Sequence, residues 1–377
     1  MRRSAAALPA GVEWHRRLLG TVAAVLAIFG VAAVYGASGI HAVENGDPAS
    51  YFALRQLLGV VVGGIGLAVA ARIDYRLWRR LAWPLLLVTL VVLIIPYIPG
   101  LRAMTPEING ARRWFRVGPI QVQPSEFAKF VIIAWCAMLA AKKGETLREF
   151  KRGVLPFLAI VGPVCALILF QPNLSTATIV ALLAGTVMFT AGAKIGHFLL
   201  LIIAAIPLAF RELTQVQYRL ARVSAFFSSG PDVTQTSWQI EQSLVGMGAG
   251  GLIGVGFGEG LQKLGYLPLA YSDFIFSTIG EEWGFLGVTF VITLFALYVW
   301  MGVLIARRAP DPFGMYLAAG ITAMIGVTAV LHMAVSLALV PTTGLPLPFV
   351  SYGRSALLIS LFATGVLINI GRQGART

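Results

Sequence analysis

The stretch LGTVAAVLAIFGVAAVYGASGI, residues 19–40, contains no charged side chain and decides the class of fold. A helix rises about 1.5 Å per residue, so about 20 apolar residues cross the ~30 Å hydrocarbon core of a bilayer. The stretch lies near the N-terminus, but it is long for a signal peptide and no A-x-A-like cleavage site follows it. We therefore predict a retained membrane-spanning helix.

Nine more stretches of this kind follow along the chain. The 377 residues are 58% hydrophobic and 12% charged, which is the profile of a polytopic membrane protein. Lipid cannot satisfy backbone hydrogen bonds and the alternating pattern of a β-barrel is absent, so every stretch is expected to be helical. The ten predicted spans are residues 19–40, 52–71, 81–98, 127–141, 154–170, 176–193, 195–210, 284–306, 315–340 and 356–370. The sequence thus predicts one all-α transmembrane domain over residues 1–377.

The distribution of Lys and Arg predicts the orientation. Both terminal segments and alternate loops carry most of the 29 basic residues, which indicates cytoplasmic termini. These groups, in a chain of net charge +13, are expected to contact anionic membrane lipids. The longest connection, residues 211–283 between the seventh and eighth spans, would then be extracytoplasmic. Cys136 and Cys165 fall inside spans, so no disulfide framework is expected, and no nucleic-acid-binding motif is present.

Polar residues gather on the predicted outer side, first in EINGARRWFRVGPIQVQPSEFAK. Arginine forks match phosphate oxygens, so Arg112 and Arg113 are candidates for an anionic ligand. The alternative is that both arginines snorkel to the interface and that Trp114 anchors the chain at the headgroup level. Glu126 and Lys129 have the i,i+3 spacing of a helical ion pair. Structural pairing is the favoured role of Glu126.

The second segment, QKLGYLPLAYSDFIFSTIGEE, places carboxylates in an otherwise apolar region. Ionisable residues in such a setting have a functional or structural reason. Asp273 is a candidate general base, and the alternative is that it caps the following helix. Glu281 and Glu282 are second candidate carboxylates that either form ion pairs or hold a divalent cation, Mg²⁺ or Mn²⁺. Ion pairing is favoured, because no further metal-ligating cluster is visible.

The third segment, TTGLPLPFVSYGRSAL, is rich in Gly and Pro and contains Ser351 and Arg354. Interrupted backbone at membrane depth is tolerated where it lines a cavity. Arg354 would contact an anion beside such a cavity or pair with an acidic residue of a loop. The three segments together predict a binding site on the outer side.

Five blocks along the chain closely resemble the SEDS family (shape, elongation, division, sporulation) of bacterial cell-wall proteins. They are NGARRW at 109–114, QPSEFAK at 123–129, QPNLSTA at 171–177, the run at 242–284 and GLPLPFVSYG at 344–353. Within the family, GVGFGEGLQKLGYLP and DFIFSTIGEE resemble the division branch of FtsW and SpoVE more than the elongation branch of RodA. The resemblance implies a peptidoglycan glycosyltransferase that polymerises lipid II on the outer face of the bacterial cytoplasmic membrane, with the division septum as its expected place.

The resemblance also implies roles for particular residues. Asp273 aligns with the aspartate that the family treats as catalytic, and an inverting displacement needs one general base. A polyprenyl tail would suit an apolar groove between spans. The residues expected to bind substrate are Arg112, Arg113, Trp114, Lys129, Lys263, Ser351 and Arg354. The implied partners are a class B penicillin-binding protein, which is a single-span transpeptidase, and other divisome proteins.

The chain departs from the family pattern in several places. Asn173 stands where an aspartate is usual, and it cannot act as a base, which puts an essential carboxylate there in doubt. Leu269, Tyr271 and Ser272 replace the usual residues before Asp273, Arg354 replaces a glycine, and Gly36 replaces a serine. None of these differences removes Asp273.

Two other classes of function fit ten spans and broken helices. A lipid II flippase would carry its charges near the midplane on both access paths, whereas the candidate residues here gather on one side. A scaffold that activates a partner would have no chemistry of its own. An elongation enzyme of the RodA type is the alternative within the family.

Overall fold

The structure is a computed structural model that describes residues 10–98, 100, 104–107, 112–117, 120–214, 226 and 235–374, and it is mainly helical. The α-helices are α1 (Ala10–Glu44), α2 (Tyr51–Ala70), α3 (Arg76–Ile94), α4 (Pro124–Lys143), α5 (Leu155–Phe170), α6 (Leu174–Thr190), α7 (Ile195–Thr214), α9 (Gln235–Ala249), α10 (Ile275–Arg307), α11 (Pro312–Ser336) and α12 (Arg354–Gly374). The shorter elements are η1 (Ile95–Tyr97), β1 (Phe115–Val117), β2 (Ile120–Val122), η3 (Gly144–Arg148), η4 (Phe150–Val154) and η5 (Gln262–Tyr266).

Within the described residues, eight helices are long and apolar enough to cross a membrane. Two shorter apolar helices, Leu174–Thr190 and Ile195–Pro207, coincide with the predicted spans at 176–193 and 195–210. Every predicted span therefore falls on a helix, which confirms the helical multi-pass class.

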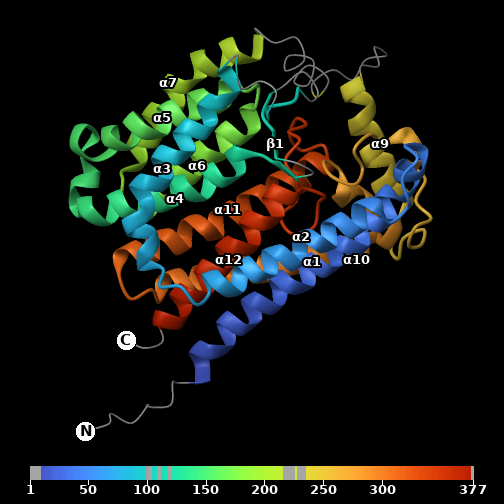
Figure 1. Cartoon of the computed structure of the whole chain (residues 1–377), viewed down its shortest axis with the longest axis horizontal. Coiled ribbons are helices and arrows are strands. Elements are labelled where there is room, and N and C mark those ends of the chain that lie inside the picture. Colours follow the sequence, from blue (N-terminus) through green and yellow to red (C-terminus); the bar gives the residue numbers. More distant parts are fainter. Residues whose placement is uncertain are drawn as a thin grey trace.

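The helices form two groups that α11 joins (Figure 1). Helices α1, α2, α10 and α12 pack side by side, while α3, α4, α5 and α6 pack in a second group. Helix α11 contacts α10 in the first group and α4 and α6 in the second. Helix α4 is the most enclosed of the eight long helices. In its most apolar stretch 78% of the residues are buried, against 22% in α2. This position allows α4 to keep charged side chains away from lipid.

The described ends of the chain and the β-hairpin lie at opposite ends of the bundle (Figure 1). The start of α1 and the end of α12 lie at one end, while β1 and α9 lie at the other, which we call the hairpin end. There β1 and β2 pair antiparallel, with Phe115 opposite Val122 and Arg116 opposite Gln121. The backbone N–H of Gln123 donates to Oγ of Ser355 at 2.9 Å, which ties the hairpin to the first turn of α12. The hairpin, which belongs to the first candidate segment, is thereby fixed beside the third.

The predicted connection at 211–283 contains more helix than expected. Helix α9 lies within it, and α10 begins at Ile275, well before the predicted start of the eighth span at 284. The predicted span begins after Glu281 and Glu282, because charged residues are not expected in a helix at membrane depth. Both side chains are buried and have polar partners, so the helix continues through them. Residues 215–225 and 227–234 of this connection lie outside the described part of the chain.

Helix α10 is broken at Gly284, and a glycine-rich segment fills the break. Gly284 has φ 61° and ψ −158°, a conformation open in practice only to glycine. The N–H groups of Val255 and Gly256 donate to the carbonyl groups of Glu281 and Glu282 at 3.0 and 3.2 Å. The break therefore exposes helix carbonyls to partners outside the helix, and the segment before η5 satisfies them.

Candidate functional site

Asp273 lies at the end of a tight turn just before α10. The N–H groups of Ser272 and Asp273 both donate to the carbonyl of Leu269 at 3.0 Å, and the hydroxyl of Ser272 donates to Oδ1 of Asp273 at 3.2 Å. Leu269 has φ 57°, which is rare for a bulky residue and marks local strain. Phe274 occupies the N-cap position, with no side-chain capping bond, so Asp273 is not the N-cap of α10. Its carboxylate is half-buried.

The loop before α12 is bonded directly to this turn. The hydroxyl of Ser351 donates to the carbonyl of Ser272 at 2.7 Å and accepts the N–H of Leu347 at 2.8 Å. A Cβ atom added to Gly344, whose φ is 66°, would lie 3.3 Å from Oδ2 of Asp273, so glycine lets the loop approach the carboxylate closely. Ser351 joins the two loops through its hydroxyl, and its predicted contact with substrate stays a prediction.

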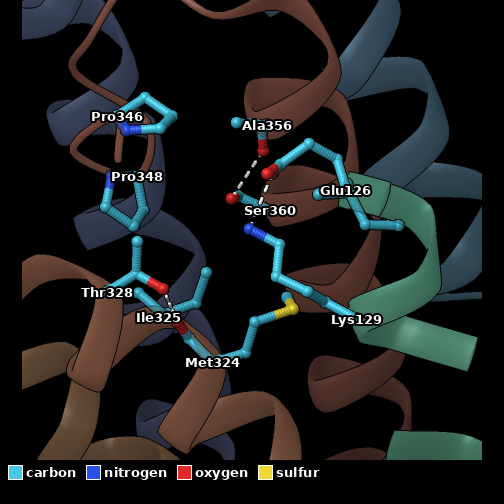
Figure 2. A pocket seen from close by; sticks show the side chains of 10 residues that line it. Glu126, Lys129, Met324, Ile325, Thr328, Pro346, Pro348, Ala356 and Ser360 are labelled. Atoms are coloured by element: carbon cyan, nitrogen blue, oxygen red, sulfur yellow. Dashed lines mark hydrogen bonds and ion pairs between the residues drawn. The ribbon is translucent and has the colours of Figure 1, made fainter. Parts of the chain in front are cut away.

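Glu126 and Lys129 form the predicted ion pair inside α4 (Figure 2). Nζ of Lys129 lies 2.7 Å from Oε2 of Glu126, and each side chain is only 4% exposed. A cavity of about 10 Å³ beside the pair is lined by residues that include Pro346 and Pro348 of the loop before α12. This volume is about that of a single water site. The pair therefore lines the same small cavity as the loop that approaches Asp273.

A second buried pair lies at the break in α10. Nζ of Lys263 is 2.9 Å from Oε1 of Glu282, and both side chains are at most 5% exposed. Oε1 of Glu281 accepts the N–H groups of Leu261 and Gln262 at 2.7 and 3.2 Å. The favoured prediction of ion pairing is confirmed for Glu282. Lys263, predicted to bind substrate, has this internal partner, and a substrate contact for it stays a prediction.

The predicted arginines lie at the hairpin. Arg112 contacts Oε2 of Glu107 at 3.1 Å and the carbonyl of Thr105 at 3.3 Å. Arg112, Arg113 and Trp114 are all half-buried and lead directly into β1. The structure thus brings these three residues together beside the hairpin, and their predicted contact with an anion is not tested by it.

An apolar groove of about 680 Å³ ends at the same hairpin. Its walls come from α2, α3, the hairpin, α4 and α12. Phe115 and Val122, which flank Arg116 and Gln121 in the two strands, form part of the lining. The structure therefore contains an apolar groove between spans, with basic residues at one end.

Two further polar residues support this region. Gln56 of α2, which sequence reasoning missed, is fully buried and donates to the carbonyl of Ser351 at 3.1 Å. Its signal in the sequence is an amide side chain within an apolar span, a type of residue that needs a polar partner. Asn173 accepts the N–H of Thr176 at 3.3 Å and caps α6. Arg354, another predicted ligand, is the half-buried first residue of α12.

The comparisons with known proteins identify the family. Residues 16–376 match the family model of FtsW, RodA and SpoVE, described as cell cycle protein. The chain belongs to the FtsW/RodA/SpoVE family. This is the SEDS family that the sequence blocks resemble, so that prediction is confirmed, and its members that are similar to this chain in sequence include FtsW and SpoVE proteins.

Relatives and solved structures of this family cover almost the whole chain. The chain is 43% identical over 345 residues to a probable peptidoglycan glycosyltransferase FtsW of Trichlorobacter lovleyi, covering 92% of this chain and 90% of the relative. It is 37% identical over 355 residues to the stage V sporulation protein E of Bacillus subtilis, covering 94% and 96%. A chain from a structure of a peptidoglycan synthase complex has a TM-score of 0.78 at 26% identity, covering 98% and 99%. RodA of Thermus thermophilus has a TM-score of 0.68 at 25% identity with the same coverage.

Proposed function

We propose that this chain is a peptidoglycan glycosyltransferase that polymerises lipid II on the outer face of the bacterial cytoplasmic membrane during cell division. The observation that carries the proposal is an apolar groove that ends at a basic hairpin and has one wall from α12, with the turn of Asp273 bonded to the loop before that helix. The names of the FtsW relatives support the same activity.

The parts of lipid II correspond to the parts of this region. Its polyprenyl tail would lie in the groove, where it would pack against apolar side chains. Its pyrophosphate would lie at the hairpin, where Arg112 and Arg113 supply bidentate donors, with Trp114 at the headgroup level. Its sugars would then reach Asp273. Lys129 and Lys263 already have buried carboxylate partners, so we assign them to the support of the site.

The proposed reaction is an inverting displacement. The 4-hydroxyl oxygen of the acceptor sugar attacks C1 of the donor sugar, Asp273 accepts the hydroxyl proton, and the bond from C1 to the pyrophosphate oxygen breaks. Undecaprenyl pyrophosphate leaves with the bonding electrons, and the arginines compensate its charge. General base catalysis of this kind contributes about 10²–10⁴-fold.

A resident divalent cation does not fit the expected carboxylates. Oε1 of Glu281 accepts two backbone N–H groups and Oε1 of Glu282 pairs with the ammonium group of Lys263, which leaves Oε2 of Glu282 as a single buried oxygen without a hydrogen-bond partner among the described residues. In the described part of the chain, no group of three or more metal-ligating side chains is found. We therefore derive no step through Mg²⁺ or Mn²⁺.

We further propose ten spans with both termini in the cytoplasm, which makes the hairpin end the outer end. The proposed partners are a class B penicillin-binding protein and other divisome proteins, and the proposed place is the division septum. A flippase is disfavoured because the candidate residues gather at one end of the bundle. The FtsW and SpoVE relatives favour a division role over elongation.

The test is polymerisation of purified lipid II by the full chain in complex with its transpeptidase partner, made inactive for crosslinking. We expect glycan strands on a gel. A parallel assay in proteoliposomes follows movement of fluorescent lipid II between leaflets. Translocation without polymer would replace the enzyme by a flippase, and a complex that does neither would be a scaffold.

A further inference from the structure

Five aromatic side chains form a cluster at the hairpin end that the mechanism above does not use. We call it the stacking cluster. It consists of His41, Tyr51, Phe52, Tyr271 and Tyr352. They come from the end of α1, the start of α2, the turn before α10 and the loop before α12. Four separate parts of the chain thus contribute rings to one place.

Phe52 lies at the centre of the stacking cluster. Its ring centroid is 4.8 Å from that of Tyr271 and 5.1 Å from that of Tyr352. The imidazole of His41 stacks on both Phe52 and Tyr271, at 5.9 and 5.5 Å. Tyr51 meets Phe52 edge to face at 5.1 Å. These are the offset and edge-to-face distances at which aromatic rings attract one another.

The stacking cluster is accessible, unlike the aromatic side chains of the core. His41 is exposed and the other four rings are half-buried, whereas Trp135, Phe157 and Tyr298 are fully buried. Rings that only stabilise the fold would gain more from complete burial. A membrane-interface belt consists of Trp and Tyr that face lipid around the periphery, whereas these rings face one another across four segments. The arrangement is that of a partly open platform.

The platform is attached to the same two loops that hold Asp273. Tyr271 precedes Asp273 by two residues, and Tyr352 directly follows Ser351. The N–H of Tyr352 donates to the carbonyl of Tyr271 at 3.1 Å, next to the bond between Ser351 and Ser272. These bonds therefore fix the position of the rings relative to the carboxylate.

The chemistry of the platform matches a pyranose ring. One face of a sugar presents weakly positive C–H groups, which the negative face of an aromatic ring attracts, while hydroxyl groups extend from the edge. Burial, followed by the nearby Tyr352 and Asp273, raises the pKa of Tyr271, so its phenol stays neutral and can donate to a hydroxyl. Cζ of Arg55 lies 4.0 Å over the ring of Tyr51 and adds donors at the rim.

We propose that the stacking cluster binds a pyranose ring of the glycan substrate and holds it beside Asp273. The proposal rests on the proposed function and assigns to it a sugar-binding surface.

The test uses the full chain in lipid nanodiscs and a soluble GlcNAc–MurNAc tetrasaccharide as the probe. Saturation-transfer NMR measures contact of protein with the C–H groups of the sugar. We expect signals for wild type and Tyr271→Phe, which keep the ring, and about tenfold weaker binding for Tyr271→Leu and His41→Ala. Tyr97→Leu is the matched control, because Tyr97 is a 40% exposed tyrosine outside the cluster.

A second readout is polymerisation of lipid II, for which Tyr271→Leu should raise KM by about tenfold and change kcat less. His41→Ala carries the test if Tyr271→Leu fails to fold, since the imidazole lies on the exposed rim. Tetrasaccharide contact and KM that stay at wild-type values in both variants would reduce the cluster to packing while the proposed function stands. Sugar contact by a wild type that makes no polymer would overturn the proposed function and keep the platform.

Discussion

Ser351 shows how a single hydroxyl can join two loops of a site. It accepts the N–H of Leu347 within its own loop and donates to the carbonyl of Ser272, the residue before Asp273. Both bonds are buried or partly buried, so losing the hydroxyl leaves polar groups without partners. The turn that holds the carboxylate thus depends on a bond between Ser272 and a residue 79 positions further along the sequence.

Ser351→Ala should lower kcat for lipid II polymerisation by about tenfold, because an unmade buried hydrogen bond costs about 1–3 kcal/mol and displaces the base. The measurement is a steady-state rate series against lipid II. Thr186→Ala on α6 is the control, since its hydroxyl bonds only to Leu182 of its own helix. A raised KM with an unchanged kcat would instead mean that Ser351 contacts substrate.

At the scale of the element, α4 and α10 each contain charged side chains that are buried in the interior of the protein. Helix α4 does so by pairing Glu126 with Lys129, and α10 does so by breaking at Gly284 beside a glycine-rich segment. In both cases the buried charges have partners, which is the condition for keeping them away from water.

Lys129→Met should lower the free energy of unfolding by about 3–5 kcal/mol, because the carboxylate of Glu126 is left buried and unpaired. Glu126→Gln combined with Lys129→Met should restore most of the loss, since neither group is then charged. Thermal unfolding in detergent measures both. If Lys129→Met melts like wild type, the pair does not stabilise α4. A stable double variant without polymerase activity would assign Lys129 to substrate after all.

Gly284→Ala should lower the free energy of unfolding by about 3 kcal/mol or more, because its φ and ψ suit only glycine and a Cβ atom would lie 2.4 Å from the backbone nitrogen of Gly254. Gly248→Ala is the matched control in α9, where an added Cβ meets no atom within 4 Å. That change should be neutral or stabilise by up to about 1 kcal/mol. Equal melting of both variants would contradict the described break in α10.

At the scale of the whole molecule, the groove and the two loops are assembled from distant parts of the chain. The groove has walls from α2, α3, α4 and α12, and the loops join residues near 272 to residues near 351. The bundle therefore acts as the frame that places an apolar surface next to a polar site.

Gly66→Leu should raise KM for lipid II by about tenfold, because the added side chain enters the groove that we assign to the polyprenyl tail. Gly64→Leu is the control, since Gly64 is on the same helix but does not line the groove. An added Cβ meets nothing within 4 Å at either position, so neither change strains the fold at that atom. Equal kinetics for the two variants would exclude the tail from this groove.

The spans could be predicted because each depends only on its own apolar residues and the thickness of a bilayer. The pair of Glu126 and Lys129 could also be predicted, since its spacing is local. The support of Asp273 could not, because Gln56 and Ser351 are 295 residues apart. The sequence predicts that Glu282 forms an ion pair, but it does not identify Lys263 as the partner. That choice depends on how the segment before α10 packs at the break in the helix.

The central claim is that Asp273 is the general base of a glycosyltransferase, and Asp273→Asn tests it most directly. Asparagine keeps the size and an acceptor oxygen but cannot take the proton. In complex with a transpeptidase-inactive partner, we predict a polymerisation rate at least about 100-fold below wild type with complex formation intact. Glu259→Gln, an exposed carboxylate in the same connection, should retain the wild-type rate. Polymer formed by Asp273→Asn at the wild-type rate would contradict the account.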